Sequence, residues 1–302
     1  MAPKVRVAVI GGGGNVGASI AFSLVAMQQH VEILIVDMNE KLAAGQANDI
    51  ADATNLSPAK CRLGQFSEVG DCDIIVITAG ARQMPGEPRS ELMGRNYKIM
   101  ESIVNNIQPI KETACILVVS NPVDVLASVI QKLTKLPPSQ VIGSGTFLDS
   151  GRLRNYLSNL LKISSSSIHA YMLGEHGDNQ FVGWSSATIG GIPLLSNEII
   201  QKANLQEIEK SIANKAYQII DAKGSTYYGI GLHAAMIIRS IIGNEYKVIP
   251  VSTYMKEYDT YMSTPSVVSA EGARPMEILL SEDEKAHFLA AAEKIKGMCN
   301  QF

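Results

Sequence analysis

The sequence predicts an α/β fold in which a doubly wound parallel sheet is followed by a domain of mixed α+β structure. Three observations predict it. Short segments alternate with segments of helical periodicity up to about residue 145, these short segments are apolar throughout, and beyond residue 145 the alternation ends. With 302 residues, of which 46% are hydrophobic, the chain is long enough to bury two cores. We therefore expect two domains, residues 1–145 and 146–302.

The strands expected in the first domain are rich in valine and isoleucine, which is typical of strands buried on both faces of a sheet. Helices are expected between them, and Pro137 and Pro138 close the last one. This alternation predicts parallel strands joined by right-handed crossovers. The expected strands are Val5–Ile10, Glu32–Asp37, Asp73–Ala79, Cys115–Asn121 and Val141–Gly145, and the expected helices cover residues 17–29, 40–56, 91–108 and 122–134.

The second domain mixes short strands with longer helices. A helix near residues 150–162 leads to a strand at Ile168–Leu173, and a β-like run follows at Val182–Gly190. No internal repeat or low-complexity segment interrupts the pattern. The remaining expected elements are helices near residues 196–222 and 228–242, strands at Lys247–Met255, Pro265–Ser269 and Met276–Leu280, and a closing amphipathic helix at 282–297.

Composition excludes several classes of function. A net charge of −3 and an isoelectric point near 6.0 give no support for binding nucleic acid or a membrane surface. No apolar run approaches the roughly 18–20 residues that span a bilayer. Because the first strand begins at Val5, no signal peptide is expected and the protein is predicted to be cytoplasmic. The cysteines follow no metal-ligand spacing, so free thiols and no bound metal are expected at Cys61, Cys72, Cys115 and Cys299.

A glycine-rich turn follows the first expected strand. Gly12, Gly14 and Gly17 match the GxGxxG pattern, whose glycines allow a tight turn, backbone approach to a pyrophosphate and close packing of helix on strand. The helix N-terminus that follows offers unpaired N–H groups to phosphates. The pattern alone is weak evidence, but Asp37 ends the next strand, where a carboxylate binds ribose hydroxyls and repels a 2′-phosphate. Together they predict a Rossmann-type domain that binds NAD.

A candidate for proton transfer lies in the second domain. His176 follows the expected strand Ile168–Leu173, and Gly174 and Gly177 let the backbone turn sharply on either side of it. Histidine gives or takes a proton near neutral pH because its unperturbed pKa lies near 6.5. The chain has five histidines, so the case for His176 depends on the residues around it.

Several motifs in the same order resemble those of the L-lactate dehydrogenases, within the lactate/malate dehydrogenase family. The resemblance covers essentially the whole chain, and co-linear motifs are far more specific than any single one. They are Thr78-Ala79-Gly80-Ala81-Arg82-Gln83, Gly86-Glu87-Pro88-Arg89, Ser120-Asn121-Pro122-Val123-Asp124, Leu148-Asp149-Ser150-Gly151-Arg152, Gly174-Glu175-His176-Gly177-Asp178 and Lys223-Gly224-Ser225-Thr226.

The resemblance implies an acid/base pair and a substrate anchor. His176 would give a proton to pyruvate or accept one from L-lactate while hydride moves to or from the cofactor. Asp149 would fix the tautomer of His176 and favour its charged form; from the sequence alone, Asp149 is equally well a helix N-cap. Arg152 would bind the substrate carboxylate through its guanidinium fork.

Further roles come with the resemblance. Arg89 would polarise the carbonyl from a lid rich in proline and glycine that begins near Arg82. Asn121, at the carboxyl end of a strand, would hydrogen-bond the substrate oxygen or the nicotinamide. The residues expected to complete the NAD site are Asn15, Val16, Ala79, Asn121 and Ile230.

Gln83 decides between lactate and malate as substrate. In the resembled family this lid position carries arginine when the substrate is a dicarboxylate, and a neutral glutamine leaves a second carboxylate unpaired in a closed site. Thr226 matches the lactate type at another pocket position. The alternative is a malate dehydrogenase that uses Arg82. A further alternative is a non-enzymatic protein on the same fold. That alternative predicts the loss of catalytic and substrate-binding residues, which the sequence retains.

Regulation and assembly are also implied by the resemblance. Arg154 and His169 match positions that bind fructose 1,6-bisphosphate at a two-fold interface in activated bacterial enzymes. The alternative is that Arg154 is a solvated helix residue and His169 an ordinary strand residue, neither with a role in regulation. A homotetramer is expected, with core or interface roles open for the helices at 40–56 and 228–242. Gly11 makes the glycine turn one residue longer than the usual form, which leaves the strength of the phosphate contacts open.

Overall fold

The computed structural model describes residues 5–81 and 89–300 of the chain. Its largest element is an 11-stranded sheet that runs through both halves of the sequence. Six parallel strands form the first part of this sheet in the order β3-β2-β1-β4-β5-β6, so the predicted parallel sheet is confirmed. These strands are β1 (Val5–Ile10), β2 (Val31–Val36), β3 (Lys60–Leu63), β4 (Ile74–Ile77), β5 (Cys115–Val118) and β6 (Val141–Gly143).

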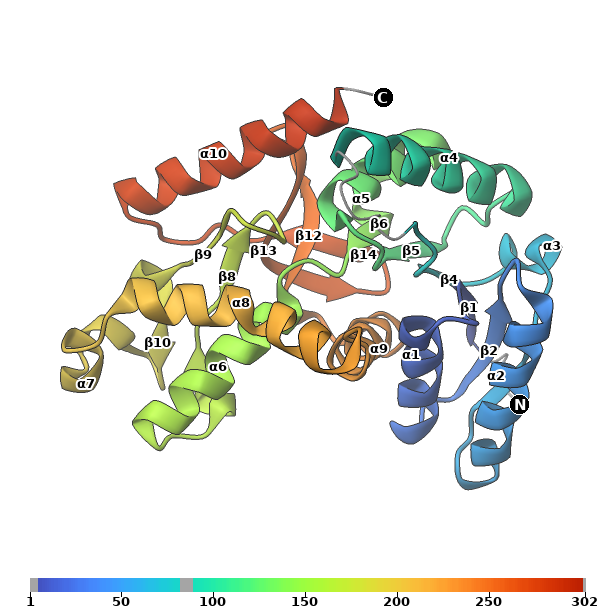
Figure 1. The fold of residues 1–302 in the computed structure, drawn as a ribbon, viewed down its shortest axis with the longest axis horizontal. Helices are drawn as coiled ribbons and strands as arrows, with labels where there is room; N and C mark the ends of the chain where they lie inside the picture. Colours follow the sequence, from blue (N-terminus) through green and yellow to red (C-terminus); the bar gives the residue numbers. More distant parts are fainter. Residues whose placement is uncertain (1–4, 82–88, 301–302) are drawn as a thin grey trace.

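Helices cover both faces of the parallel strands. Figure 1 shows α4 and α5 on one side of the sheet and α1 with α9 on the other. Ala8 and Ile10 of β1 pack into one apolar cluster and Val7 and Val9 into the other, because successive side chains of a strand point to opposite faces. The helices are α1 (Asn15–Ala26), α2 (Glu40–Ala53), α4 (Arg89–Ile107), α5 (Val123–Thr134) and α9 (Tyr228–Ile242).

The sheet continues into the second half as antiparallel strands. Ser252 of β12 pairs with Gly143 of β6, and β13, β8 and β9 follow, with β14 beside β13. A separate three-stranded sheet contains β7, β10 and β11. The remaining elements are β7 (Ile168–His169), β8 (Met172–Gly174), β9 (Gln180–Val182), β10 (Thr188–Ile189), β11 (Ile192–Pro193), β12 (Lys247–Met255), β13 (Thr260–Ser269), β14 (Gly272–Pro275), α6 (Phe147–Leu161), α7 (Glu198–Gln201), α8 (Leu205–Lys223) and α10 (Glu282–Cys299).

Two expected strands are divided in the structure. The run Ile168–Leu173 forms β7 in the small sheet and the start of β8 in the large one, so the chain changes sheets within a single apolar run. The β-like run Val182–Gly190 is interrupted after Val182 by a 3₁₀ turn at Trp184–Ser186 before β10 begins. Apolar content predicted that both runs contribute to the core but not the points at which the backbone leaves a sheet.

Two further expectations are wrong. The helical region expected over residues 196–222 is two helices: α7 ends at Gln201, and Asn204 caps α8 by accepting a hydrogen bond from the Glu207 N–H. The segment Met276–Leu280 is not a strand: β14 ends at Pro275, and Leu279 is 75% exposed. An apolar run predicts a strand only where a neighbouring strand buries it.

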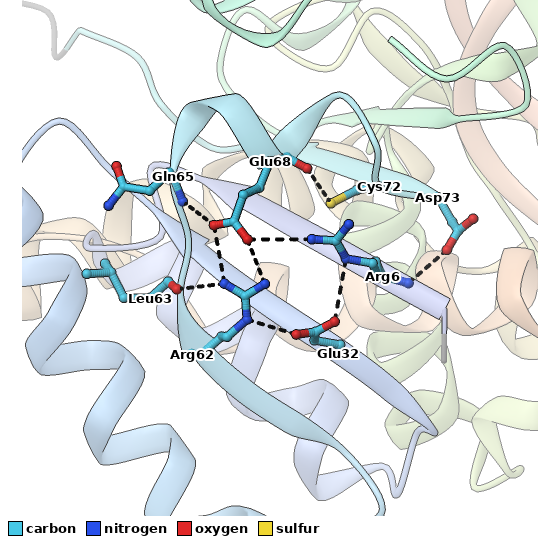
Figure 2. A network of polar contacts seen from close by, with 8 residues as sticks. All are labelled: Arg6, Glu32, Arg62, Leu63, Gln65, Glu68, Cys72 and Asp73. Atoms are coloured by element: carbon cyan, nitrogen blue, oxygen red, sulfur yellow. Dashed lines mark hydrogen bonds and ion pairs between the residues drawn. The ribbon is translucent and has the colours of Figure 1, made fainter. Parts of the chain in front are cut away.

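The sequence analysis missed β3 and the short helix α3 (Phe66–Val69). β3 is an edge strand with exposed side chains, so it lacks the apolar run of its neighbours. Figure 2 shows how charge secures it: Arg62 of β3 binds Glu32 of β2 at 2.8 Å and Glu68 of α3 at 2.7 Å. Arg6 of β1 completes the group through Glu32 and Glu68 at 3.5 and 3.7 Å. This network joins three adjacent strands and α3.

Candidate active site

The glycine turn lies at the carboxyl end of β1, where the strand order reverses between β1 and β4. Gly11 has a φ of +81°, and a Cβ atom placed on it would lie 2.6 Å from the backbone nitrogen of Ala79. Its N–H and that of Gly12 both donate to the Val36 carbonyl. A Cβ on Gly17 would lie 2.7 Å from the Gly11 oxygen. Gly11 is therefore a close-packed part of the turn that only glycine fills.

The N-terminus of α1 has free donors. Its N-cap is Gly14, which supplies no side-chain cap, and its first turn carries no acidic residue. Asn15, Val16 and Gly17 are the first residues of the helix. Uncapped N–H groups at the positive end of a helix dipole form an anion site, so this end fits a pyrophosphate.

A groove of about 740 Å³ continues from the glycine turn past the carboxyl ends of β2 and β4 and along α4. Apolar side chains, including Ile99 and Ile103, line part of it, and Asp37 and Ala79 lie on its wall. The Asp37 carboxylate accepts hydrogen bonds from the backbone N–H groups of Gly13 (3.1 Å) and Asn39 (3.0 Å). An apolar groove with one fixed carboxylate suits an adenine ring and its ribose hydroxyls, so the residues present fit NAD.

The second part of the site is a carboxylate held between a histidine and an arginine. His176 Nδ1 lies 2.7 Å from Asp149 Oδ2, and Arg152 Nη1 lies 2.9 Å from Asp149 Oδ1. Asp149 and Arg152 are three residues apart on α6, so they share one helix face. Asp149 lies in the first turn of α6, but the N-cap is Thr146 and the two carboxylate oxygens bind the side chains of His176 and Arg152. The N-cap alternative for Asp149 is therefore wrong.

Burial and charge act in opposite directions on this pair. Burial raises the pKa of Asp149, but the charges and hydrogen bonds of His176 and Arg152 outweigh it and hold that pKa below its ordinary value. Burial lowers the pKa of His176, but the Asp149 carboxylate outweighs it and raises that pKa above its ordinary value near 6.5. Because a carboxylate only accepts, Nδ1 carries a proton and Nε2 is the nitrogen free to exchange one.

Asp124 is a site residue that the sequence analysis missed. The backbone N–H of His176 donates to Asp124 Oδ2 at 2.8 Å, and Asp124 is 2% exposed. Burial raises the pKa of Asp124 to about 6, although the hydrogen bond from His176 favours the charged form. The available signal was a carboxylate in an otherwise apolar helix start, Val123-Asp124-Val125.

The other predicted residues fall into three groups. Asn121 follows β5 at the carboxyl edge of the sheet, and its carbonyl accepts from the Asn96 side chain at 3.2 Å. Thr226 lies between α8 and α9, and Ile230 is in the first turn of α9. Gln83 and Arg82 lie outside the described residues, as does the side chain of Arg89, the first residue of α4. The structure therefore brings together His176, Asp149 and Arg152 but does not place the lid.

The two residues predicted to bind an effector lie on neighbouring elements. Arg154 is on α6, half-buried, with its Nε donating to the Ser150 carbonyl at 3.3 Å. His169 is exposed on β7 and pairs with Thr188 of β10. In residues 5–81 and 89–300, no group of three His, Cys, Asp or Glu side chains is placed to hold a metal ion. No helix in those ranges is long and apolar enough to cross a membrane.

Comparisons with known proteins agree with this geometry. Two family models match: the NAD binding domain of lactate/malate dehydrogenase over residues 5–143, and the alpha/beta C-terminal domain of lactate/malate dehydrogenase over residues 146–302. The chain is 43% identical to L-lactate dehydrogenase A of Rhizopus oryzae, with 97% of this chain and 92% of the relative covered. It is 40% identical to L-lactate dehydrogenase 2 of Bacillus cereus, with 95% of each covered.

Solved structures give the same result. A lactate dehydrogenase from a Medee basin deep-sea metagenome library superposes with a TM-score of 0.92 at 35% identity and covers 98% of each chain. The minor L-lactate dehydrogenase of Enterococcus mundtii, solved in a ligand-bound form, also has a TM-score of 0.92, at 32% identity, with 99% of this chain and 98% of that one covered.

Proposed function

The chain belongs to the lactate/malate dehydrogenase family, and from this premise we propose that it is an NAD-dependent L-lactate dehydrogenase. The observation that carries the proposal is Asp149 bound at once to His176 and Arg152. His176 can transfer a proton and Arg152 can bind a carboxylate. Reduction of a 2-oxo acid needs both functions. The family and the cofactor predicted from the sequence are confirmed by the comparisons.

The proposed reaction is reversible. NADH, when bound at the glycine turn, would supply the hydride that reduces the carbonyl carbon of pyruvate. Arg152 holds the substrate carboxylate with the N–H groups that Asp149 does not use, and so fixes the carbonyl carbon for attack. Protonated His176 gives its Nε2 proton to the carbonyl oxygen, which yields L-lactate and neutral His176. Asp149 stabilises the imidazolium before transfer.

Other residues are proposed to support this step. Arg89 stabilises the charge that develops on the substrate oxygen, and Asn121 orients the carbonyl or the nicotinamide. The residues that would hold NAD are Gly12, Gly14, Asn15, Val16 and Gly17 at the phosphates, Asp37 at the ribose, and Ala79, Asn121 and Ile230 towards the nicotinamide.

The relatives support lactate rather than malate as the substrate, because each curated relative named above is an L-lactate dehydrogenase. We propose that Gln83 and Thr226 set this preference, since a neutral Gln83 leaves the second carboxylate of oxaloacetate without a counter-charge. Gln83→Arg is expected to reverse the preference. An unchanged ratio of the two kcat/KM values would contradict a role for Gln83.

Turnover of pyruvate by His176→Asn tests the proposed chemistry. The variant is expected to bind NADH as tightly as the wild-type protein, because His176 lies apart from the glycine turn, and to lose at least about a hundredfold in kcat because no proton donor remains. NADH fluorescence measures binding and the loss of NADH absorbance measures turnover. Wild-type protein that binds NADH without reducing pyruvate would contradict the proposal and favour a binding protein.

Assembly, location and regulation are proposed on the family likeness. We propose a cytoplasmic homotetramer that acts at the end of glycolysis, where pyruvate is reduced to lactate. Exposed apolar side chains on α1, α2 and α9 support association: Phe22, Leu42 and Leu232 are 53%, 47% and 45% exposed. Fructose 1,6-bisphosphate is proposed to bind Arg154 and His169, which lie on adjoining elements. Activation at subsaturating pyruvate that Arg154→Gln abolishes would support this site, and insensitivity of the wild type would refute it.

A further inference from the structure

An ion pair joins the last helix to the turn that carries His176. Lys294 Nζ of α10 donates to Glu175 Oε2 at 2.8 Å. The Glu175 side chain is 9% exposed and that of Lys294 is 29% exposed, so water screens the pair only partly. Glu175 immediately precedes His176 and lies 119 residues from Lys294 in the sequence. The pair therefore ties the turn that carries His176 to a helix that is distant in the sequence.

Three carboxylates surround His176. Asp149 binds its ring, Asp124 binds its backbone N–H, and Glu175 is its neighbour in the chain. Arg152 pairs with Asp149, and Lys294 pairs with Glu175. Asp124 has no ion pair with a lysine or arginine among the residues that the structure describes.

The charge of Asp124 is therefore sensitive to its surroundings. Burial raises the pKa of Asp124, and the negative charge of Glu175 raises it further, whereas the Ser252 side chain and His176 lower it. The thiol of Cys299, on α10, also lies within electrostatic range. Glu175 without its ammonium partner would favour the protonated form of Asp124.

We propose that Lys294 is a positioning residue for His176. By binding Glu175, it holds the turn and offsets the negative charge beside Asp124, so that Asp124 stays ionised and keeps its charged hydrogen bond to the His176 backbone. This inference rests on the proposed function, because it assumes that His176 transfers the proton. On this proposal, α10 helps to determine the pH below which the reaction slows.

A pH series on Lys294→Met tests the proposal. The measured quantity is the ratio of variant to wild-type kcat for pyruvate reduction at saturating NADH. We expect a ratio near one at about pH 8 and a loss of about two- to threefold at about pH 6, because a rise of one unit in the pKa of Asp124 lowers its ionised fraction about fivefold there while the neutral form keeps part of the activity. KM for pyruvate is expected to change little, because Arg152 keeps its partner Asp149.

Three further variants separate charge from packing. Lys294→Arg restores the positive charge and should recover most of the activity at low pH. Glu175→Gln combined with Lys294→Met removes both charges and should bring the ratio back towards one. Lys285→Met is the matched control, because Lys285 on the same helix forms a solvent-exposed pair with Glu282 at 2.8 Å. The ratio of its kcat to that of the wild type should not change with pH.

The outcomes are distinct. A loss in Lys294→Met that is the same at every pH, with a lowered melting temperature, would overturn the proposal and leave Lys294 as a structural contact. Failure of the double variant to recover would also overturn it, because the effect would then not arise from Glu175. A wild-type protein that reduces no pyruvate would instead refute the proposed function.

Discussion

The backbone N–H of His176 and the carboxylate of Asp124 are joined by a hydrogen bond of 2.8 Å in the protein interior. Asp149 binds the ring of the same residue at 2.7 Å. One histidine is thus held by two carboxylates, one through its side chain and one through its main chain. The first sets the charge of the imidazole, and the second sets the place of the turn that carries it.

Asp124→Asn keeps the shape of the side chain and removes its charge. We expect kcat for pyruvate to fall about five- to tenfold, because a hydrogen bond to a charged group is worth about 1.5–3 kcal/mol and its loss lets the turn move. KM should change less than kcat. Steady-state kinetics at neutral pH measure both, and Asp71→Asn at an exposed turn is the control. Unchanged kcat would show that Asp124 does not position His176.

The pH dependence of pyruvate reduction follows from the raised pKa of His176. Reduction needs protonated His176, so on the alkaline side kcat/KM should fall as pH rises through a pKa above the ordinary value near 6.5. Asp149→Asn removes the charge that raises this pKa, so the fall should begin at lower pH. The measurement is kcat/KM from about pH 5 to pH 9. A midpoint that does not move in Asp149→Asn would contradict the electrostatic role of Asp149.

Gly11→Ala tests the glycine turn. The new Cβ would meet the backbone nitrogen of Ala79 at 2.6 Å, and the φ of +81° disfavours any side chain. We expect NADH to bind at least about tenfold more weakly, because the turn must shift away from the pyrophosphate. Gly45→Ala in α2 is the matched control, since no atom beyond its chain neighbours and its own helix backbone lies within 4 Å of its Cβ position. Equal NADH affinities in both variants would contradict this account.

The ion network of β3 should affect stability and not catalysis. The hydrogen bonds and charge of Arg62 hold the pKa of Glu68 below its ordinary value, so Glu68 stabilises the folded state at neutral pH and this contribution is lost as pH falls through the lowered pKa. Arg62→Met is expected to cost about 1 kcal/mol at neutral pH, because the network is partly exposed. Thermal unfolding at neutral and acid pH checks this. An equal loss at both would mean that the charge of Arg62 is not responsible.

Where burial decided the structure, the sequence predicted it closely. Val5–Ile10 and Lys247–Met255 are strands with the expected bounds, and the helix at 228–242 is α9. Edge strand β3 was missed because half of its side chains face solvent. The run at Ile168–Leu173 was misread because both of its halves contribute buried apolar residues, Ile168 in one sheet and Met172 and Leu173 in the other. The division at residues 145 and 146 stays a prediction.

The candidate site was predictable where the motifs are specific. The order of motifs led to His176, Asp149 and Arg152, and the structure places them in contact. Asp124 and Lys294 were missed for different reasons. The signal for Asp124 was a carboxylate among apolar residues, which does not reveal its backbone partner. Lys294 meets Glu175 only through the fold, because the two are 119 residues apart in the sequence.

Initial rates of NADH oxidation on pyruvate and on oxaloacetate test the central claim most directly. The account predicts a kcat/KM for pyruvate at least about a hundredfold higher, because burying an unpaired second carboxylate costs several kcal/mol. Higher efficiency on oxaloacetate would mean that another cation pairs with the second carboxylate, and the assignment to lactate would be wrong.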